Sequence, residues 1–200
     1  MKRLLVILIL TFSFQNLTKA DDIRDFEIEG MSIGDSLLDH FNKNEIKNSK
    51  VDWYQHLEKD KFITTVLSSS DFMKYEYVDV NTKYGDNNYI IDTMSASIYF
   101  GKDKFISDIN ECYIKQNDIS KEFTNIFKNS KREGPIKFKH LGADPSGKST
   151  YTDIYFYLND GYTVLISCYD FSDHLKSEGS IDFLAIILRS NEVDNWMDNF

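Results

Sequence analysis

Residues 142–149 (GADPSGKS) match, letter for letter, the G-x-x-x-x-G-K-[ST] pattern of loops that bind nucleotide phosphates. In such loops the backbone amides open the N-terminus of a helix, whose dipole and free N–H groups hold the phosphate oxygens. The segment that follows here, Tyr151–Leu158, instead alternates with period two and is rich in aromatic residues, which is typical of a strand. We therefore interpret residues 142–149 as a polar loop between strands, and predict no nucleotide cofactor.

The two cysteines, Cys112 and Cys168, could carry redox chemistry or form a structural disulfide. A reactive thiol needs a setting that lowers its pKa, such as C-x-x-C or a neighbouring histidine, and the local sequence has neither. In an oxidising compartment a pair of cysteines is more often bridged than free. The sequence favours a disulfide between Cys112 and Cys168.

The other residues that could do chemistry form no convergent motif. The four histidines lie on separate segments without H-x-x-x-H or H-E-x-x-H spacing: His40, His56, His140 and His174. A calcium loop that would start at Asp79 has Lys83 in a ligand position and Tyr84 where the turn needs glycine. A carboxylate pair for glycoside cleavage cannot be selected from 32 acidic residues. We predict no metal and no cofactor, and assign no catalytic residue.

Tyrosines form the candidate binding surface. Tyr155 and Tyr157 alternate with apolar neighbours in one predicted strand, so they should face away from the core. The same argument applies to Tyr169 beside Cys168 and to Tyr99 beside Ile98. Tyrosine combines a large contact area with a polar tip, which suits recognition of a protein, peptide or glycan. Cross-strand tyrosine pairing on a half-covered sheet is the alternative, and the sequence leaves both open.

Hydrophobic periodicity predicts the elements that would position these residues. Apolar residues step by three and four through 104–129, which indicates one long helix, capped by Asp103 and broken by Gly134-Pro135. Alternation indicates strands at residues 61–67, 74–84, 89–100, 136–141, 151–158, 162–170 and 180–189. Short helices are expected at 37–41 and 191–200. Adjacent strands with one inserted helix predict an α+β fold: an antiparallel sheet with the long helix packed on one face, and both cysteines directed into the layer between them.

The first 20 residues read as a secretory signal peptide. Lys2 and Arg3 precede the apolar run Leu4–Phe14, and Thr18-Lys19-Ala20 supplies a cleavage site. The run has 11 residues, whereas a membrane span needs about 20, and no cysteine follows the cleavage site to accept lipid. We expect a mature chain of one domain, residues 21–200, that is soluble in the periplasm or secreted and has no transmembrane segment.

Composition narrows the classes of partner. Without the leader the chain has 20 basic and 32 acidic residues, a formal charge of −12, which argues against nucleic acid and anionic membranes as partners. The length fits one domain, and neither a Pro/Gly/Ser-rich linker nor an internal repeat interrupts it.

Several segments resemble a group of small secreted proteins from marine bacteria of the Pelagibacter type. The likeness covers most of the mature chain and is carried by residues 28–38 (IEGMSIGDSLL), Cys112-Tyr113-x-Lys115, residues 146–149 with Tyr151-Thr152, and Cys168-Tyr169-Asp170. It implies a shared fold and export, and it implies no activity. The opening Gly30–Phe41 is also similar to the Gly-Met-Ser start of small outer-membrane assembly lipoproteins, but lacks their lipid-bearing cysteine.

These observations predict an exported, non-catalytic binding or interaction protein, with an envelope protein, a peptide or a glycan as partner. The alternative is a small periplasmic hydrolase whose site is assembled from residues distant in sequence. A cleft in which a nucleophile, a histidine and a carboxylate converge would favour the hydrolase, and an open sheet face bearing tyrosines would favour binding.

Overall fold

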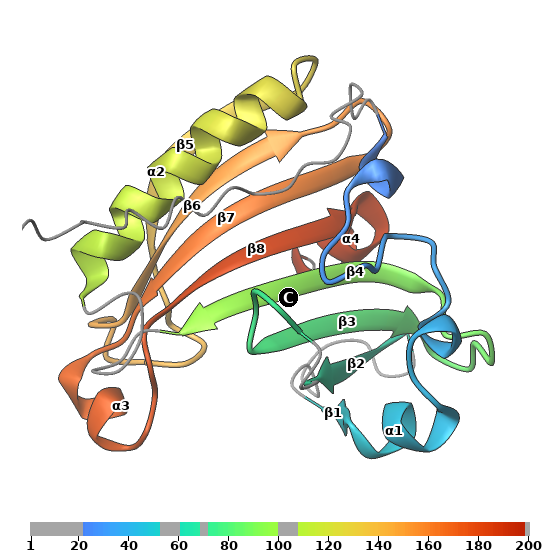
Figure 1. Ribbon diagram of the computed structural model, residues 1–200. Helices are drawn as coiled ribbons and strands as arrows, with labels where there is room; N and C mark the ends of the chain where they lie inside the picture. The colour runs from blue at the N-terminus through green and yellow to red at the C-terminus, as the bar shows by residue number, and fades with distance from the viewer. Residues whose placement is uncertain (1–21, 53–60, 69–71, 100–107, 199–200) are drawn as a thin grey trace, which may run out of the picture.

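A computed structural model describes residues 22–52, 61–68, 72–99 and 108–198. It confirms the α+β fold, with one antiparallel eight-stranded sheet in the order β1-β2-β3-β4-β8-β7-β6-β5 (Figure 1). The strands are β1 (Lys50–Val51), β2 (Phe62–Leu67), β3 (Tyr77–Lys83), β4 (Ile91–Tyr99), β5 (Lys131–Lys139), β6 (Thr150–Tyr157), β7 (Tyr162–Asp170) and β8 (Phe183–Ser190). The helices are η1 (Ile23–Asp25), η2 (Leu37–Asp39), α1 (Lys43–Asn48), α2 (Ile109–Ile126), α3 (Asp173–Ser177) and α4 (Asn191–Asp198).

Helix α2 packs along the half of the sheet that contains β7 and β8 (Figure 1). Its apolar stripe is buried there, and the rings of Phe123 and Phe127 contact Phe156 on β6, with centroids 5.9 and 6.3 Å apart. The predicted stripe is therefore the face that holds the helix to the sheet. We call this side of the sheet the helix face.

The ends of the long helix differ from the prediction. Residues 100–107, with the predicted cap Asp103, lie outside the described residues, and the described helix is capped by Asp108, which accepts hydrogen bonds from two backbone amides. The helix ends at Ile126, and Gly134-Pro135 lies inside strand β5 instead of breaking the helix. Because β5 is an edge strand and its register shifts between Glu133 and Ile136, it accommodates a proline without an N–H group. At Gly134 a Cβ atom would lie 2.5 Å from the Asp153 carbonyl oxygen, so the bulge requires glycine.

The N-terminal segment covers the other half of the helix face. Its apolar side chains are almost completely buried, and the segment is tied to the start of β4 by backbone hydrogen bonds from Gly34 to Ile91 and from Leu37 to Tyr89. The buried side chains are Ile23, Ile28, Met31, Ile33 and Leu37. Together with α2 they close one continuous core against the sheet.

Two features lock α2 in place. Cys112 on α2 and Cys168 on β7 are fully buried at disulfide distance, with their Cα atoms 6.1 Å apart, as the shared orientation of the two residues predicted. Gln116, a polar residue in the apolar stripe, donates from Nε2 to the carbonyl oxygens of Thr152 and Ile166, each at 2.6 Å. These two hydrogen bonds from one buried amide fix the position of the helix along β6 and β7.

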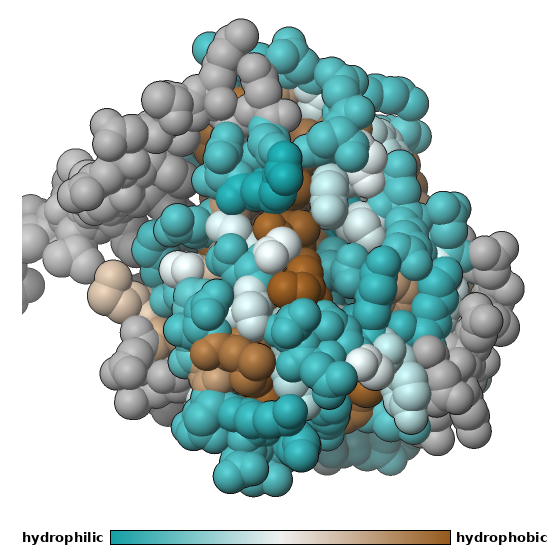
Figure 2. Space-filling model, turned by 90° about the vertical axis from the view of Figure 1, so that its right-hand side faces the viewer, coloured by the Kyte–Doolittle hydropathy of each residue, from teal (hydrophilic) through white to brown (hydrophobic). Residues whose placement is uncertain are grey.

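No helix in the described part of the chain is long and apolar enough to cross a membrane. Figure 2 shows the side that lies at the right in Figure 1, which is mostly hydrophilic with apolar residues in small separate areas. Large exposed apolar residues include Met73 in the segment before β3, Ile114 on α2 and Leu141 in the loop after β5.

Candidate ligand-binding pocket

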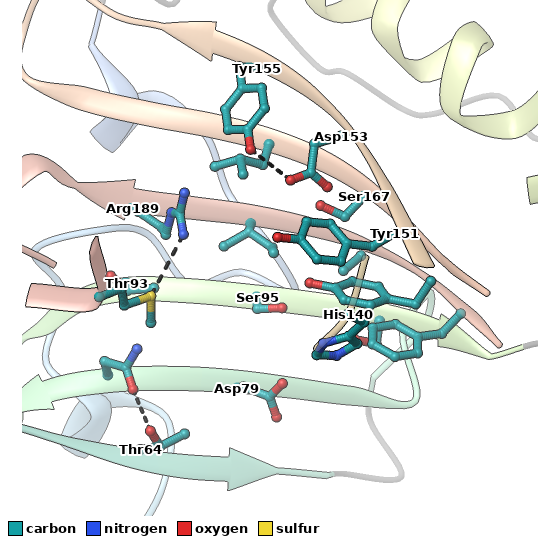
Figure 3. Close-up of a pocket in the computed structure, with 18 of the residues that line it drawn as sticks. Thr64, Asp79, Thr93, Ser95, His140, Tyr151, Asp153, Tyr155, Ser167 and Arg189 are labelled. Atoms are coloured by element: carbon teal, nitrogen blue, oxygen red, sulfur yellow. Dashed lines mark hydrogen bonds between the residues drawn. The ribbon is translucent and has the colours of Figure 1, made fainter. Parts of the chain in front are cut away.

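The side of the sheet opposite the helix face carries a cavity of about 600 Å³ (Figure 3). Because strand side chains alternate between faces, the odd-numbered residues of β4, β7 and β8 point into it while their even-numbered neighbours form the core. We call this side the pocket face. Helix α4 reaches it at one end with Met197.

Small side chains make the hollow. Ser95 and Ser97 on β4, Ala185 on β8 and Ser167 on β7 lie in the middle of the sheet and line the cavity, with larger residues around them. Register places Ser97, Ala185 and Ser167 side by side on adjacent strands. The volume therefore follows from a row of small residues across the centre of the sheet.

A row of aromatic rings borders the cavity at one end. Tyr99, Phe183, Tyr169 and Tyr151 are consecutive cross-strand partners on β4, β8, β7 and β6. Their centroids are 5.5, 4.2 and 5.7 Å apart along the row. The ring of His140 lies 5.6 Å from that of Tyr151, and burial lowers its pKa. We call the rings of Tyr99, Phe183, Tyr169 and Tyr151 the aromatic row.

Two carboxyl groups from opposite sides of the cavity point into it. Asp153 on β6 accepts a hydrogen bond of 2.8 Å from the Tyr155 hydroxyl and lies opposite Ser167 in the ladder. Burial raises the pKa of Asp153, while Ser167 and Tyr155 act in the other direction. Asp79 on β3 has no such support, and burial alone raises its pKa from 3.8 to about 7. Figure 3 shows both carboxyl groups directed toward the cavity.

Among the described residues, Arg189 is the cation that lines this cavity, and a carboxylate already compensates its charge. Its Nε lies 2.6 Å from Oδ1 of Asp194 on α4, and its Nη1 contacts the sulfur of Met197 at 3.7 Å. Asp194 on helix α4 thus compensates the charge of the guanidinium group.

Several buried polar atoms in the lining lack a protein partner. The Thr93 hydroxyl, in a residue 3% exposed, has no hydrogen-bond partner among the described residues. Asp153 Oδ1 and the Ser167 hydroxyl belong to cross-strand partners that are 4% and 1% exposed, and neither atom has a hydrogen-bond partner among the described residues. An unsatisfied buried polar group costs about 1–3 kcal/mol, so such groups are left for water or a ligand.

The structure brings together three of the four candidate tyrosines. Tyr99 and Tyr169 belong to the aromatic row, and Tyr155 lines the cavity farther along β6. Tyr157 does not line it: this residue is 38% exposed and its ring stacks on Tyr155 at 5.7 Å. Tyrosine pairing and a shared cavity therefore coexist on this face.

Sequence reasoning missed the polar lining residues Asp79, Asn81, Ser95, Asp153 and Arg189. A signal was present, because Asp79 and Asn81 alternate with the buried Val78 and Val80. The alternation identifies a polar face but does not show that it is hollow. The false calcium motif that starts at Asp79 is part of strand β3.

The histidines do not converge. His140 lies beside the aromatic row, His40 follows η2 and His174 is exposed on α3, while His56 lies outside the described residues. In the described ranges no group of three or more His, Cys, Asp or Glu residues could hold a metal ion.

The phosphate-loop match is a turn between β5 and β6, and a strand follows it, as predicted. The Asp144 carboxylate accepts hydrogen bonds from the amides of Ser146 and Ser149, each at 3.0 Å, and from the Ser149 hydroxyl at 2.8 Å. These contacts hold the pKa of Asp144 well below its usual range. The backbone amides that would bind a phosphate thus already donate hydrogen bonds to the carboxylate of Asp144.

We expect Lys148→Ala to leave thermal stability nearly unchanged, because Lys148 is exposed on this loop. Titration of the wild-type protein with Mg-ATP, followed by calorimetry, should show no saturable signal. Micromolar binding that the substitution abolishes would contradict this interpretation of the loop.

Comparisons of the chain with known protein families, with curated proteins and with solved structures found no match.

Proposed function

We propose that the protein is an exported, non-catalytic binding protein that holds a small polar molecule in the cavity of the pocket face. The leader-like residues 1–20, the cysteine pair at disulfide distance and the resemblance to secreted proteins support export. A volume of about 600 Å³ is typical of small-molecule sites. A glycan unit or a peptide side chain would also fit, whereas an extended protein surface would not enter the hollow.

The observation that carries this proposal is the set of buried polar atoms left without a protein partner in the lining. Thr93, Ser167 and Asp153 line the cavity from three strands, and each has a buried oxygen without a hydrogen-bond partner among the described residues. Groups placed in this way lose hydrogen bonds to bulk water on folding, and a polar ligand would restore them.

The hydrolase alternative has no comparable observation in its favour. The His140 ring packs against Tyr151 and Tyr169, at 5.6 and 5.7 Å, while Ser167 lies opposite Asp153. In the part of the chain that the structure describes, no serine hydroxyl hydrogen-bonds to a histidine ring. The groups available in the cavity suit recognition better than nucleophilic attack.

A variant that fills the cavity tests the proposal. Ser95→Phe places a ring in the hollow from the centre of β4, and Ile114→Phe, on the exposed side of α2, is the matched control. We would titrate neutral sugars, amino acids, carboxylates and amines and follow backbone amide shifts by NMR. At least one compound should saturate amides of the pocket face, and Ser95→Phe should weaken its binding by at least about tenfold, while Ile114→Phe should not.

Thermal unfolding of both variants verifies that each is folded. The proposal fails if no compound binds, or if binding survives Ser95→Phe unchanged.

A further inference from the structure

The charges that line the cavity do not balance. They come from Asp79, Asp153 and Arg189, and Arg189 is paired with Asp194, a residue of α4 outside the lining. The neighbouring His140 is half-buried, and burial shifts its pKa downward, which favours the neutral ring at neutral pH. Among the described residues the cavity is therefore lined by two carboxyl groups and by one cation, Arg189, whose charge Asp194 already compensates.

The two carboxyl groups differ in what already supports them. Asp153 has the Tyr155 hydroxyl at 2.8 Å, Ser167 opposite it in the ladder, and the positive field of Arg189. Asp79 has no hydrogen bond and no ion pair with any residue in the described ranges. Because an ionised carboxylate that is partly buried without a partner is costly, Asp79 is the group that gains most from a cationic ligand.

The surroundings of Asp79 suit an organic cation better than a metal ion. Tyr77 precedes Asp79 by two residues on the same face of β3, and its ring lies 5.7 Å from that of Tyr99, which begins the aromatic row. The aromatic row borders the cavity and gives the organic part of such a cation an apolar surface to contact. A metal ion would need further carboxylate or imidazole ligands, and the described residues supply no cluster of three.

We propose that the cavity takes an organic cation, whose ammonium group pairs with Asp79 and whose apolar part lies against the aromatic row. This inference rests on the proposed function and adds the chemical class of the ligand. Thr93 and Ser95, next to Asp79 and Asn81 on the neighbouring strand, offer hydroxyl groups to a polar substituent on the same molecule.

Permanently charged probes and neutral molecules of similar shape test the role of charge. We would titrate choline against 3,3-dimethylbutan-1-ol, and benzyltrimethylammonium against benzyl alcohol, by calorimetry at about pH 8 and low salt. At least one cation should bind, and the affinity of its neutral counterpart should be at least about tenfold lower. Asp79→Asn should weaken the binding of that cation by at least about tenfold. Asp92→Asn on β4, which does not line the cavity, should change its affinity by less than about twofold.

The outcomes separate this inference from the proposed function. Equal binding of cations and neutral counterparts, or cation binding unaffected by Asp79→Asn, would overturn the ligand class. The ligand class would also be overturned if a neutral sugar, a carboxylate or Ca²⁺ bound while neither cation did. If Ser95→Phe then blocked the binding of that ligand, the proposed function would still hold. Failure of every compound, cations included, would overturn both.

Discussion

Replacing Asp79 by asparagine should stabilise the protein by about 2 to 4 kcal/mol at pH 8 and by almost nothing near pH 3. Burial raises the pKa of Asp79 from 3.8 to about 7, so the folded protein keeps a proton that the unfolded chain releases between these values. The contribution of the protonated carboxyl is fully present below pH 3.8 and is lost as the pH rises through 7. Asparagine is neutral throughout and does not pay this cost.

Urea unfolding of the wild type and of Asp79→Asn at several pH values between about 3 and 8 measures the difference. Asp39→Asn, an exposed residue at the end of η2, is the control and should show no comparable trend with pH. A gain in Asp79→Asn that is the same at every pH would mean that ionisation is not its cause.

This prediction is connected with the proposed ligand. A partly buried carboxyl that destabilises the protein at neutral pH is compensated when a cation binds beside it. The same substitution should therefore raise the stability of the free protein and weaken the binding of a cation. A residue with a purely structural role would not be expected to produce both effects.

Removing the disulfide should lower the free energy of unfolding by up to ~4 kcal/mol in the chain-entropy model. Cys112 and Cys168 are 56 positions apart, so the bond constrains a long loop in the unfolded chain and joins α2 to β7 in the folded one. The double variant Cys112→Ala with Cys168→Ala removes the bond while keeping small apolar groups in the buried layer. Urea unfolding should place this variant close to the reduced wild type and well below the oxidised wild type.

Thiol labelling of the denatured, unreduced protein gives an independent measurement. Exported material should show no reactive thiols before reduction and two per chain after it. Two reactive thiols before reduction would contradict the bond, and equal stability of the oxidised and reduced protein would contradict its energetic role.

Periodicity in the sequence determined the local elements and the directions of their side chains. The alternation in residues 151–158 and 162–170 predicted β6 and β7 to within a residue and placed Cys168 and Tyr169 on opposite faces. The spacing of apolar residues predicted α2 and put Cys112 on its buried stripe. Because these patterns depend on neighbours a few residues apart, they can be recognised without the fold.

Strand β5 shows where local signals were insufficient. Gly134-Pro135 is typical of a break, and the sequence alone did not show that the chain had already left the helix at Ile126. An edge position and a register shift allow proline inside a strand, and both depend on which strand lies alongside.

The pocket was decided by the tertiary structure. Strand β8 pairs with β4 on one side and β7 on the other, which puts Asp79 and Asp153, residues from distant parts of the chain, on one face around a row of small residues. Helix α4 then neutralises Arg189, while Asp79 receives no partner in the described ranges. Alternation along a strand shows which face a residue occupies, but burial and charge balance depend on the neighbours that long-range pairing supplies, and these neighbours give Asp79 its proposed role.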